Sequence, residues 1–493
     1  MFSFFIYLLL SGVWSIISSG DHMNENVVKK KKFEIDMCSG NLFAKILIFS
    51  LPLALMGILQ LLYNTADLIV VGNFSNQEGA LGAVGSTSSL INLIVNLFMG
   101  LSVGTNVVVA RLYGAKEFER VGRVVHTSIF ISFIIGVILG VMGFFMAGTF
   151  LHLMHNDLEL SKIYLQIYFI GMPFNMVYNF AAAILRAVGD TKRPLIFLSV
   201  AGIVNIVLNL FFVIVCKMGV AGVAIATVIS QVISCVLIMW ALLKSNEAYR
   251  FRFKEIAIYK KELWEITKIG LPAGIQGSIF SISNVIIQSS VNMFTPQNVV
   301  MDGNSAASSL EGFVYTAMNS VYHAALAFTG QNVGAKNKKN IIQVTIDSLI
   351  IVTMIGVFMG GLTFIFGKQL LRIYVNTPDK INVGYIRLHY LCLPYFLCGI
   401  MDVMVGVLRG LGYSTIPMIV SIIGVCGFRI AWIYLVFRQN TNYVDYNDLH
   451  LLYISYPISW IVTFAIHLLT YFIVSRKVFN AFRENKTDIE VAA

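Results

Sequence analysis

Long apolar runs recur along the whole chain and constrain its fold more than any other feature. About twelve of them are long enough, at roughly 20 residues each, to cross the hydrocarbon core of a bilayer. Lipid cannot satisfy free backbone groups, so runs of this length predict helices, whereas barrel strands would be about half as long and would alternate. Since 57% of the residues are hydrophobic, the sequence predicts an all-α integral membrane protein embedded in the lipid bilayer. The runs lie near residues 46–74, 83–112, 124–148, 158–187, 194–216, 220–244, 266–294, 303–331, 341–367, 380–410, 416–438 and 449–475.

Basic residues gather in alternate connections, which predicts the orientation of the chain. Lys and Arg crowd the connections 111–123, 186–193, 244–261 and 336–339 but are absent from 73–82 and 295–304. By the positive-inside rule, both termini are cytoplasmic in a multi-pass protein that we expect in the plasma membrane. Lys368, Arg372 and Lys380 fit poorly, because their connection is then outside. The net charge of +10 follows from these loops, so no nucleic acid partner is expected.

The chain contains an internal repeat, with six predicted helices in each half. "SLPLALMG" around Pro52 corresponds to "GLPAGIQG" around Pro272, and Gly114-Ala115-Lys116 corresponds to Gly334-Ala335-Lys336, both at an offset of 220 residues (272 − 52 and 334 − 114). "LRAVGDTKRP" and "LRGLGYSTIP" follow at an offset of 223 (408 − 185). A constant offset over such a distance indicates duplication.

The repeat divides the chain into two lobes. We place the first lobe at residues 43–245 and the second at 263–476, joined by a basic cytoplasmic linker at 246–262. An extension at 1–42 precedes them and a cytoplasmic tail at 477–493 follows. The apolar start of the extension lacks the basic region of a signal peptide, and we expect translation to begin at Met23.

The number of helices per half predicts how the halves are related. An even number places both halves in the same orientation, as parallel repeats about an axis along the membrane normal. Two matched bundles can rock about a central cavity, which is the geometry of a secondary transporter. The alternative is that duplication only produced a large bundle.

A polar stripe interrupts the first apolar run. Gln60, Tyr63, Asn64 and Asp67 recur at helical spacing and share one face. A carboxylate at bilayer depth is costly, so it normally points into a bundle or a wet cavity and marks a functional site. We therefore regard Asp67 as the leading functional candidate.

The fifth and sixth runs supply further oxygen atoms. Asn205 and Asn209 lie one helical turn apart, and Thr227 lies in the next run. With Asp67 they offer one carboxylate, two amide oxygens and a hydroxyl, the ligands of a hard cation such as sodium. Alternatively, Asp67 carries a proton, or the amides and the hydroxyl only bond neighbouring helices.

The second half contains its own intramembrane polar residues. Glu311, Tyr315, Asn319 and Tyr322 share one face of the eighth run, and an acid with aromatic rings suits an organic cation. Asp402 and Arg429 are further charges, for which a structural ion pair is the alternative interpretation. His323 and Asp347 are weaker candidates.

The paired "LP" and "GAK" motifs, "NTADLIVVGNF", "GQNVGA" and "LRAVGD" resemble the multidrug and toxic-compound extrusion (MATE) family over about residues 43–476. The resemblance implies twelve helices in two lobes, rocker-switch alternating access, and export of amphipathic, often cationic compounds in exchange for sodium ions or protons. It implies a coupling-cation site at the positions matching Asp67, Asn205, Asn209 and Thr227, with Gln60, Tyr164 and Asn179 lining the same lobe.

The chain departs from the family pattern in two places. Some members carry Asp where this chain has Asn209, which leaves the identity of the coupling ion open. The acid that certain branches place on the seventh helix is missing from "GIQGSIFSISNVIIQ", and Glu311 is a possible substitute.

Other functions are less well supported. A lipid-linked oligosaccharide flippase shares the two-lobe architecture but needs a cationic cavity, whereas the internal charges lean acidic, with Asp67, Glu311, Asp402 and Asp347 against chiefly Arg429. An enzyme is not expected, because HExxH, G-x-S-x-G, Walker and metal-spaced Cys/His motifs are absent from the sequence; a channel remains conceivable. We expect a monomer that transports small molecules and needs no resident cofactor.

Overall fold

The computed structural model describes residues 33–75, 77, 80–153 and 159–491. Residues 1–32, including Met23, lie outside the described part. All regular structure in the described ranges is helical, which confirms the predicted all-α fold. The first half consists of α2 (Leu42–Phe74), α3 (Ala80–Gly114), α4 (Phe118–Leu153), α5 (Glu159–Ile170), α6 (Met172–Ala187), α7 (Lys192–Leu210), the π-helix η1 (Phe211–Val215) and α8 (Gly219–Lys244).

The second half begins after a connection that contains the short 3-10 helix η2 (Phe253–Glu255). Its principal helices are α9 (Lys260–Val291), α10 (Gln297–Gly334), α11 (Lys338–Ile365), α12 (Gly367–Leu371), α13 (Pro378–Cys392) and α14 (Phe396–Gly410). A continuous span follows, in which α-helical and π-helical turns alternate: α15 (Thr415–Ser421), η3 (Ile422–Gly427), α16 (Phe428–Trp432) and η4 (Ile433–Phe437). The half ends with η5 (Tyr446–Asp448), α17 (Leu449–Tyr453) and α18 (Ser455–Val491).

The helices agree closely with the predicted apolar runs. In the described residues, nine helices are long and apolar enough to cross a membrane, and two bent pairs raise the number to eleven. The remaining run of the twelve corresponds to α10, which is 38 residues long but is not among the helices that pass the apolarity test. Its sequence is less apolar because it carries Asn304, Glu311 and Asn319.

The backbone repeats its geometry in the two halves. Lys116 and Lys336 of the two "GAK" turns both have a positive φ, 60° and 52°, and so do Gly189 and Gly412, 99° and 92°. The bent pair α5 and α6 meets at 50° and the pair α13 and α14 at 48°. Left-handed residues are uncommon outside such turns, so these matched positions indicate that the sequence repeat is a structural one.

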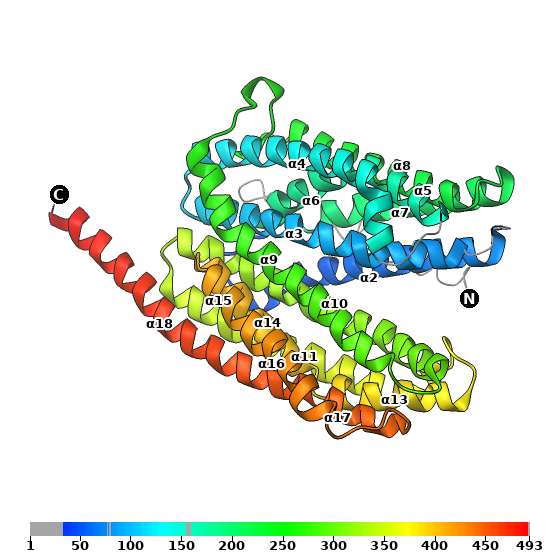
Figure 1. Cartoon of the computed structure of the whole chain (residues 1–493). Coiled ribbons are helices and arrows are strands. Elements are labelled where there is room, and N and C mark those ends of the chain that lie inside the picture. The colour runs from blue at the N-terminus through cyan, green and yellow to red at the C-terminus, as the bar shows by residue number, and fades with distance from the viewer. Residues whose placement is uncertain (1–32, 76, 78–79, 154–158, 492–493) are drawn as a thin grey trace, which may run out of the picture.

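Figure 1 shows the halves as two helical bundles that meet toward one end and spread apart toward the other. They meet where α3 crosses α9. A Cβ atom added to Gly100 would overlap the backbone of Gly274, and one added to Gly104 would overlap the backbone at Ile266 and Gly270. Small residues allow this close approach of two helices. The contact lies toward the end that carries the connections 114–118, 187–192, 244–260 and 334–338, which we call the basic end.

Each bundle buries its own apolar core, and α2 contributes to both. The first part of α2 packs in the core of the second bundle, where the rings of Phe49 and Phe328 contact edge to face with 5.5 Å between their centroids. Val70 and Val71, near the end of α2, belong to a core of the first bundle. Many large apolar side chains stay exposed on the outer surface, including Phe145 at 78% and Leu435 at 74%, as expected for residues that face lipid.

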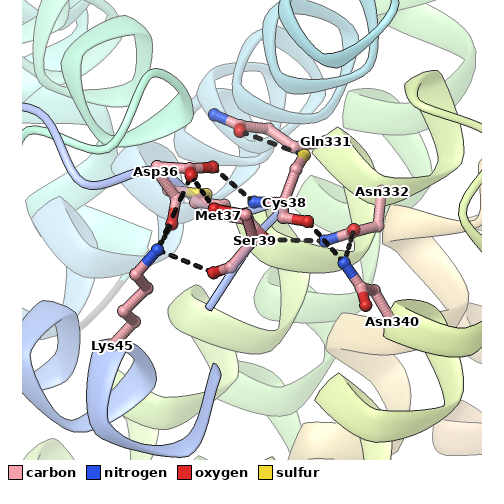
Figure 2. A network of polar contacts seen from close by, with 8 residues as sticks. All are labelled: Asp36, Met37, Cys38, Ser39, Lys45, Gln331, Asn332 and Asn340. Atoms are coloured by element: carbon pink, nitrogen blue, oxygen red, sulfur yellow. Dashed lines mark hydrogen bonds and ion pairs between the residues drawn. The ribbon is translucent and has the colours of Figure 1, made fainter. Parts of the chain in front are cut away.

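An N-terminal segment, residues 33–41, links the two bundles at the basic end. Its backbone N–H at Ile35 donates to the carbonyl of Gly189 in the first bundle at 3.2 Å. Figure 2 shows its contacts with the second bundle, where Asn332 Nδ2 donates to the Met37 carbonyl at 2.8 Å and Asn340 Nδ2 donates to the Cys38 carbonyl at 2.6 Å. The segment therefore holds the two bundles together at this end.

Candidate functional site

Asp67 of α2 lies at the centre of a buried polar cluster. Asn209 on α7 donates from Nδ2 to Asp67 Oδ1 at 2.5 Å, and the Thr227 hydroxyl on α8 donates to Asp67 Oδ2 at 3.5 Å. Helical spacing places Asn205 beside Asn209, whose Nδ2 also lies 3.2 Å from Asn205 Oδ1. Asn205 Nδ2 in turn donates to the Thr227 hydroxyl at 3.5 Å. The structure thus brings together Asp67, Asn205, Asn209 and Thr227, the residues expected to bind the coupling cation.

The cluster contains a negative charge without a local positive partner. Asp67 is only 7% exposed, and among the described residues no Lys or Arg forms an ion pair with it. Asn209 is fully buried, and its Oδ1 accepts no hydrogen bond within the described protein. A buried acceptor beside a buried carboxylate is costly unless a cation or a proton joins them.

The donor set favours a hard ion over a transition metal. Its ligands are oxygen atoms, whereas zinc and related metals prefer histidine and cysteine. Within the described residues, no group of three His, Cys, Asp or Glu side chains could hold such a metal. The cluster can therefore accept an alkali cation or a proton.

The cluster opens onto a cavity of about 740 Å³ between the two bundles. Asp67, Asn205 and Thr227 line it, while Asn209 lies behind them. A volume of this size suits a drug-sized molecule. The lining also includes seven of the residues expected there from sequence: Gln60, Tyr63, Asn64, Tyr164, Asn179, Tyr315 and Asp402.

Several lining residues are held by specific contacts. The ring of Tyr63 packs against Gly202 of α7, where a larger residue would clash, and the hydroxyl donates to the Ser199 carbonyl at 3.5 Å. Asn179 Nδ2 donates to Asn175 Oδ1 at 2.9 Å. These contacts fix the polar wall that the first bundle presents to the cavity.

Glu311 does not occupy the position expected for it. It does not line the cavity, and its two carboxylate oxygens accept hydrogen bonds from Nε and Nη2 of Arg387 on α13, each at 2.8 Å. The pair is buried, with Glu311 5% and Arg387 9% exposed. The expectation that Glu311 meets an organic cation is therefore wrong in this structure, because the charge is already neutralised.

Asp402 and Arg429 do not form the ion pair considered above. The guanidinium of Arg429 lies 3.8 Å from the ring centroid of Tyr456, and its Nε donates to Ser459 at 3.0 Å. Asp402 instead lines the cavity, within hydrogen-bonding reach of Tyr315. His323 also lines the cavity, whereas Asp347 does not.

Two arginines that line the cavity were not among the predicted site residues. The sequence analysis places Arg186 in a basic connection and gives Arg409 no role, but the structure places them near the ends of α6 and α14, at the cavity. Both lie in the repeated motif "LRAVGD"/"LRGLGY", and 409 − 186 is again 223. The shared arginine was the signal that could have identified them.

Comparison with known proteins assigns the chain to a family. The MatE family model matches residues 52–211 and 272–435, one match in each half and together most of the chain. The chain belongs to the MATE family. Among relatives of this MATE chain is the "Probable multidrug resistance protein YpnP" of Bacillus subtilis, 27% identical over 395 residues that cover 79% of this chain and 87% of YpnP. The "Probable multidrug resistance protein NorM" of Thermotoga maritima is 25% identical over 398 residues, covering 78% and 83%.

Solved structures share the fold of this MATE chain. A multidrug resistance MATE family transporter of the MOP superfamily, in an outward-facing conformation, superposes with a TM-score of 0.83 at 22% identity, covering 93% of this chain and 99% of that one. A MOP superfamily transporter from Pyrococcus furiosus Vc1 gives a TM-score of 0.83 at 21% identity, covering 93% and 100%. The predicted two-lobe architecture is therefore confirmed.

Proposed function

We propose that this MATE chain is a multidrug efflux transporter that exports amphipathic, often cationic, organic compounds in exchange for sodium ions or protons. The observation that carries the proposal is the cluster around Asp67. It holds a carboxylate that forms no ion pair within the described residues, at the wall of a cavity that both bundles line. A coupling site of this kind must be filled and emptied in alternation, which requires access from the cavity.

The mechanism follows from the arrangement of the bundles. They pack closely where α3 crosses α9 and spread apart toward the other end, so a rocking motion would move the opening of the cavity from one side to the other. Coupling requires only that cation and substrate favour different arrangements. A membrane potential contributes about 2.3 kcal/mol per charge per 100 mV, enough to bias a carrier with two states.

Either coupling ion is chemically reasonable. The carboxylate, amide and hydroxyl oxygens of the cluster suit sodium, and a buried carboxylate can instead bind and release a proton. In neither case would the chain need a resident cofactor or catalyse a reaction.

The proposal includes location and orientation. The N-terminal segment 33–41 lies at the basic end, where Glu34 accepts a hydrogen bond from Tyr113 at 2.9 Å, and Arg120 pairs with Glu265 at 2.9 Å across the two bundles. Positive loops favour the cytoplasmic side, so this end would face the cytoplasm, with both termini on the cytoplasmic side of the plasma membrane. We propose a monomer, because each bundle contributes to one shared cavity within a single chain.

The experiment is transport of a fluorescent organic cation into liposomes that contain the full chain, with sodium and pH gradients imposed separately. One gradient should drive uphill transport by the wild type, and Asp67→Asn should abolish it without loss of folded protein. Asp379→Asn, which removes an exposed carboxylate at the start of α13, is the matched control. Undiminished uphill transport by Asp67→Asn would exclude the proposed coupling site.

The flippase alternative can be tested in the same liposomes. A pyrophosphate-linked lipid needs a strongly cationic cavity, but the lining here combines Arg186 and Arg409 with Asp67 and Asp402. We therefore expect the organic cation, and not a lipid pyrophosphate, to compete for the cavity.

A further inference from the structure

The two cavity arginines occupy equivalent positions in the two bundles. Arg186 is the second-to-last residue of α6 and Arg409 the second-to-last residue of α14. Both guanidinium groups are near enough to His323 on α10 to interact with it electrostatically. Both also interact with the neighbouring Tyr322. The repeat thus brings two positive charges, one from each bundle, to the same part of the cavity.

Neither guanidinium is fully satisfied by the protein. Arg409 is 5% exposed, and it donates from Nη1 to Tyr322 at 2.6 Å and from Nη2 to Gln276 at 2.8 Å. Within the described residues its buried Nε has no acceptor, and neither has the buried Nε of Arg186. The negative end of a helix favours a cation nearby, but it does not supply acceptors for these N–H groups.

The acids near the cavity do not neutralise these arginines directly. Asp402 interacts electrostatically with Arg409, yet neither arginine forms an ion pair within the described residues, in contrast to the closed pair of Glu311 and Arg387. A guanidinium that presents free N–H donors to a cavity matches a carboxylate, which accepts two parallel hydrogen bonds.

We propose that Arg186 and Arg409 form an anion-binding subsite in the cavity, which binds the carboxylate of an amphoteric organic substrate. Asp402, on the same cavity wall, is placed to receive the cationic nitrogen of that substrate. Asp67 and Asp402 would repel a polyanion, so the arrangement favours a molecule with one charge of each sign. This inference rests on the proposed transport function and specifies its substrate class.

The test compares two probes that differ by a single charge. A fluorescent rhodamine carboxylate and its methyl ester share the same cationic ring system, but only the carboxylate carries the anionic group. Liposomes containing the full-length wild type should transport both. Arg186→Gln should reduce transport of the carboxylate by about tenfold and leave that of the ester within about twofold, because only the former uses the subsite.

Further variants separate this role from a structural one. The guanidinium of Arg186 makes no hydrogen bond within the described residues, so its replacement should not disturb folding. Arg409→Gln repeats the test from the second bundle, and Arg409→Lys should restore part of the carboxylate transport. Arg372→Gln, which removes an exposed arginine outside the cavity, should change neither probe. A parallel loss of both probes in Arg186→Gln, or no loss of either, would overturn the proposal.

A binding measurement keeps the inference independent of coupling. If the wild type transports neither probe, the transport proposal fails, but fluorescence anisotropy of the rhodamine carboxylate with the detergent-solubilised full chain still tests the subsite. An increase in Kd of about tenfold for Arg186→Gln with the carboxylate alone supports the subsite. Equal affinity in wild type and variant refutes it.

Discussion

Glu311 of α10 and Arg387 of α13 form a buried, bidentate ion pair, although 76 residues separate them in the sequence. Asn304 Oδ1 accepts a further hydrogen bond from Arg387 Nη1 at 2.8 Å. Every polar group of such a pair must be satisfied, because the cost of removing two charges from water is otherwise not recovered. The pair therefore has a structural role within the second bundle.

Glu311→Gln should destabilise the protein by about 3–5 kcal/mol, because it leaves the Arg387 charge buried without a counter-charge. Thermal unfolding in detergent measures the loss. The double variant Glu311→Leu with Arg387→Leu should recover most of the stability, since it removes both charges. A Glu311→Gln protein of wild-type stability that no longer transports organic cations would instead indicate a direct role in the cavity.

Asn209→Ala should weaken binding of the coupling ion by about tenfold or more. The substitution removes a side chain that contacts both Asp67 and Asn205, and a hydrogen bond to a charged group contributes about 1.5–3 kcal/mol. The measurement is the sodium concentration or the pH at which transport is half-maximal. Asn96→Ala is the control, because Asn96 also lines the cavity but bonds Ser281 of α9. An unchanged ion dependence in Asn209→Ala would place the coupling ion elsewhere.

Releasing the N-terminal segment should expose Cys38. Burial and the neighbouring Asp36 carboxylate raise the pKa of the Cys38 thiol to about 11, so only about one thiol in a thousand is ionised at pH 8 and reaction with maleimide is slow. Combining Asn332→Ala with Asn340→Ala removes two hydrogen bonds that hold this segment on the second bundle (Figure 2). We expect labelling of a protein with Cys38 as its single cysteine to accelerate more than tenfold.

The control for this labelling is Asn440→Ala, because the side chain of Asn440 donates within its own turn, to the Val436 carbonyl at 2.7 Å. Its labelling rate should equal that of the parent. Equal rates in the double variant would show that the two asparagines do not hold the segment in place.

Gly100→Ala should disrupt the packing of α3 on α9. The new Cβ would overlap the backbone of Gly274, and forced overpacking costs about 1–3 kcal/mol. We expect a lower unfolding temperature and slower transport, together with a longer distance between spin labels on α3 and α9. Gly361→Ala is the matched control, since a Cβ at that position of α11 meets no other atom within 4 Å and alanine favours a helix. Equal unfolding temperatures for the two variants would contradict this account of the contact.

Much of the fold could be predicted because membrane helices leave a direct record in the sequence. Apolar length located the helices, including the bent pairs, because lipid excludes unpaired backbone groups whatever the packing. Constant offsets located the repeat, which the matched turns at Lys116 and Lys336 then show in the backbone. Only α10 departed from the expected apolar composition, since much of its surface packs inside the protein.

The candidate site was partly predictable for a related reason. Helical spacing places Asn205 and Asn209 on one face, and an acid such as Asp67 must turn away from lipid. These local rules identify residues that face the interior, but they do not identify the neighbours that such residues meet there. Glu311 and Asp67 are both intramembrane acids, and nothing in their local sequence distinguishes them.

The sequence by itself determined the helices, their duplication and the polar faces, because these depend on the chemistry of nearby residues and on the thickness of the membrane. Only the tertiary structure decided that Glu311 meets an arginine, that Asp67 meets Asn209 and Thr227, and that Arg186 and Arg409 share a cavity. Such pairings depend on how helices far apart in the chain pack together, and the energy of a buried charge is set by the groups within a few ångströms of it.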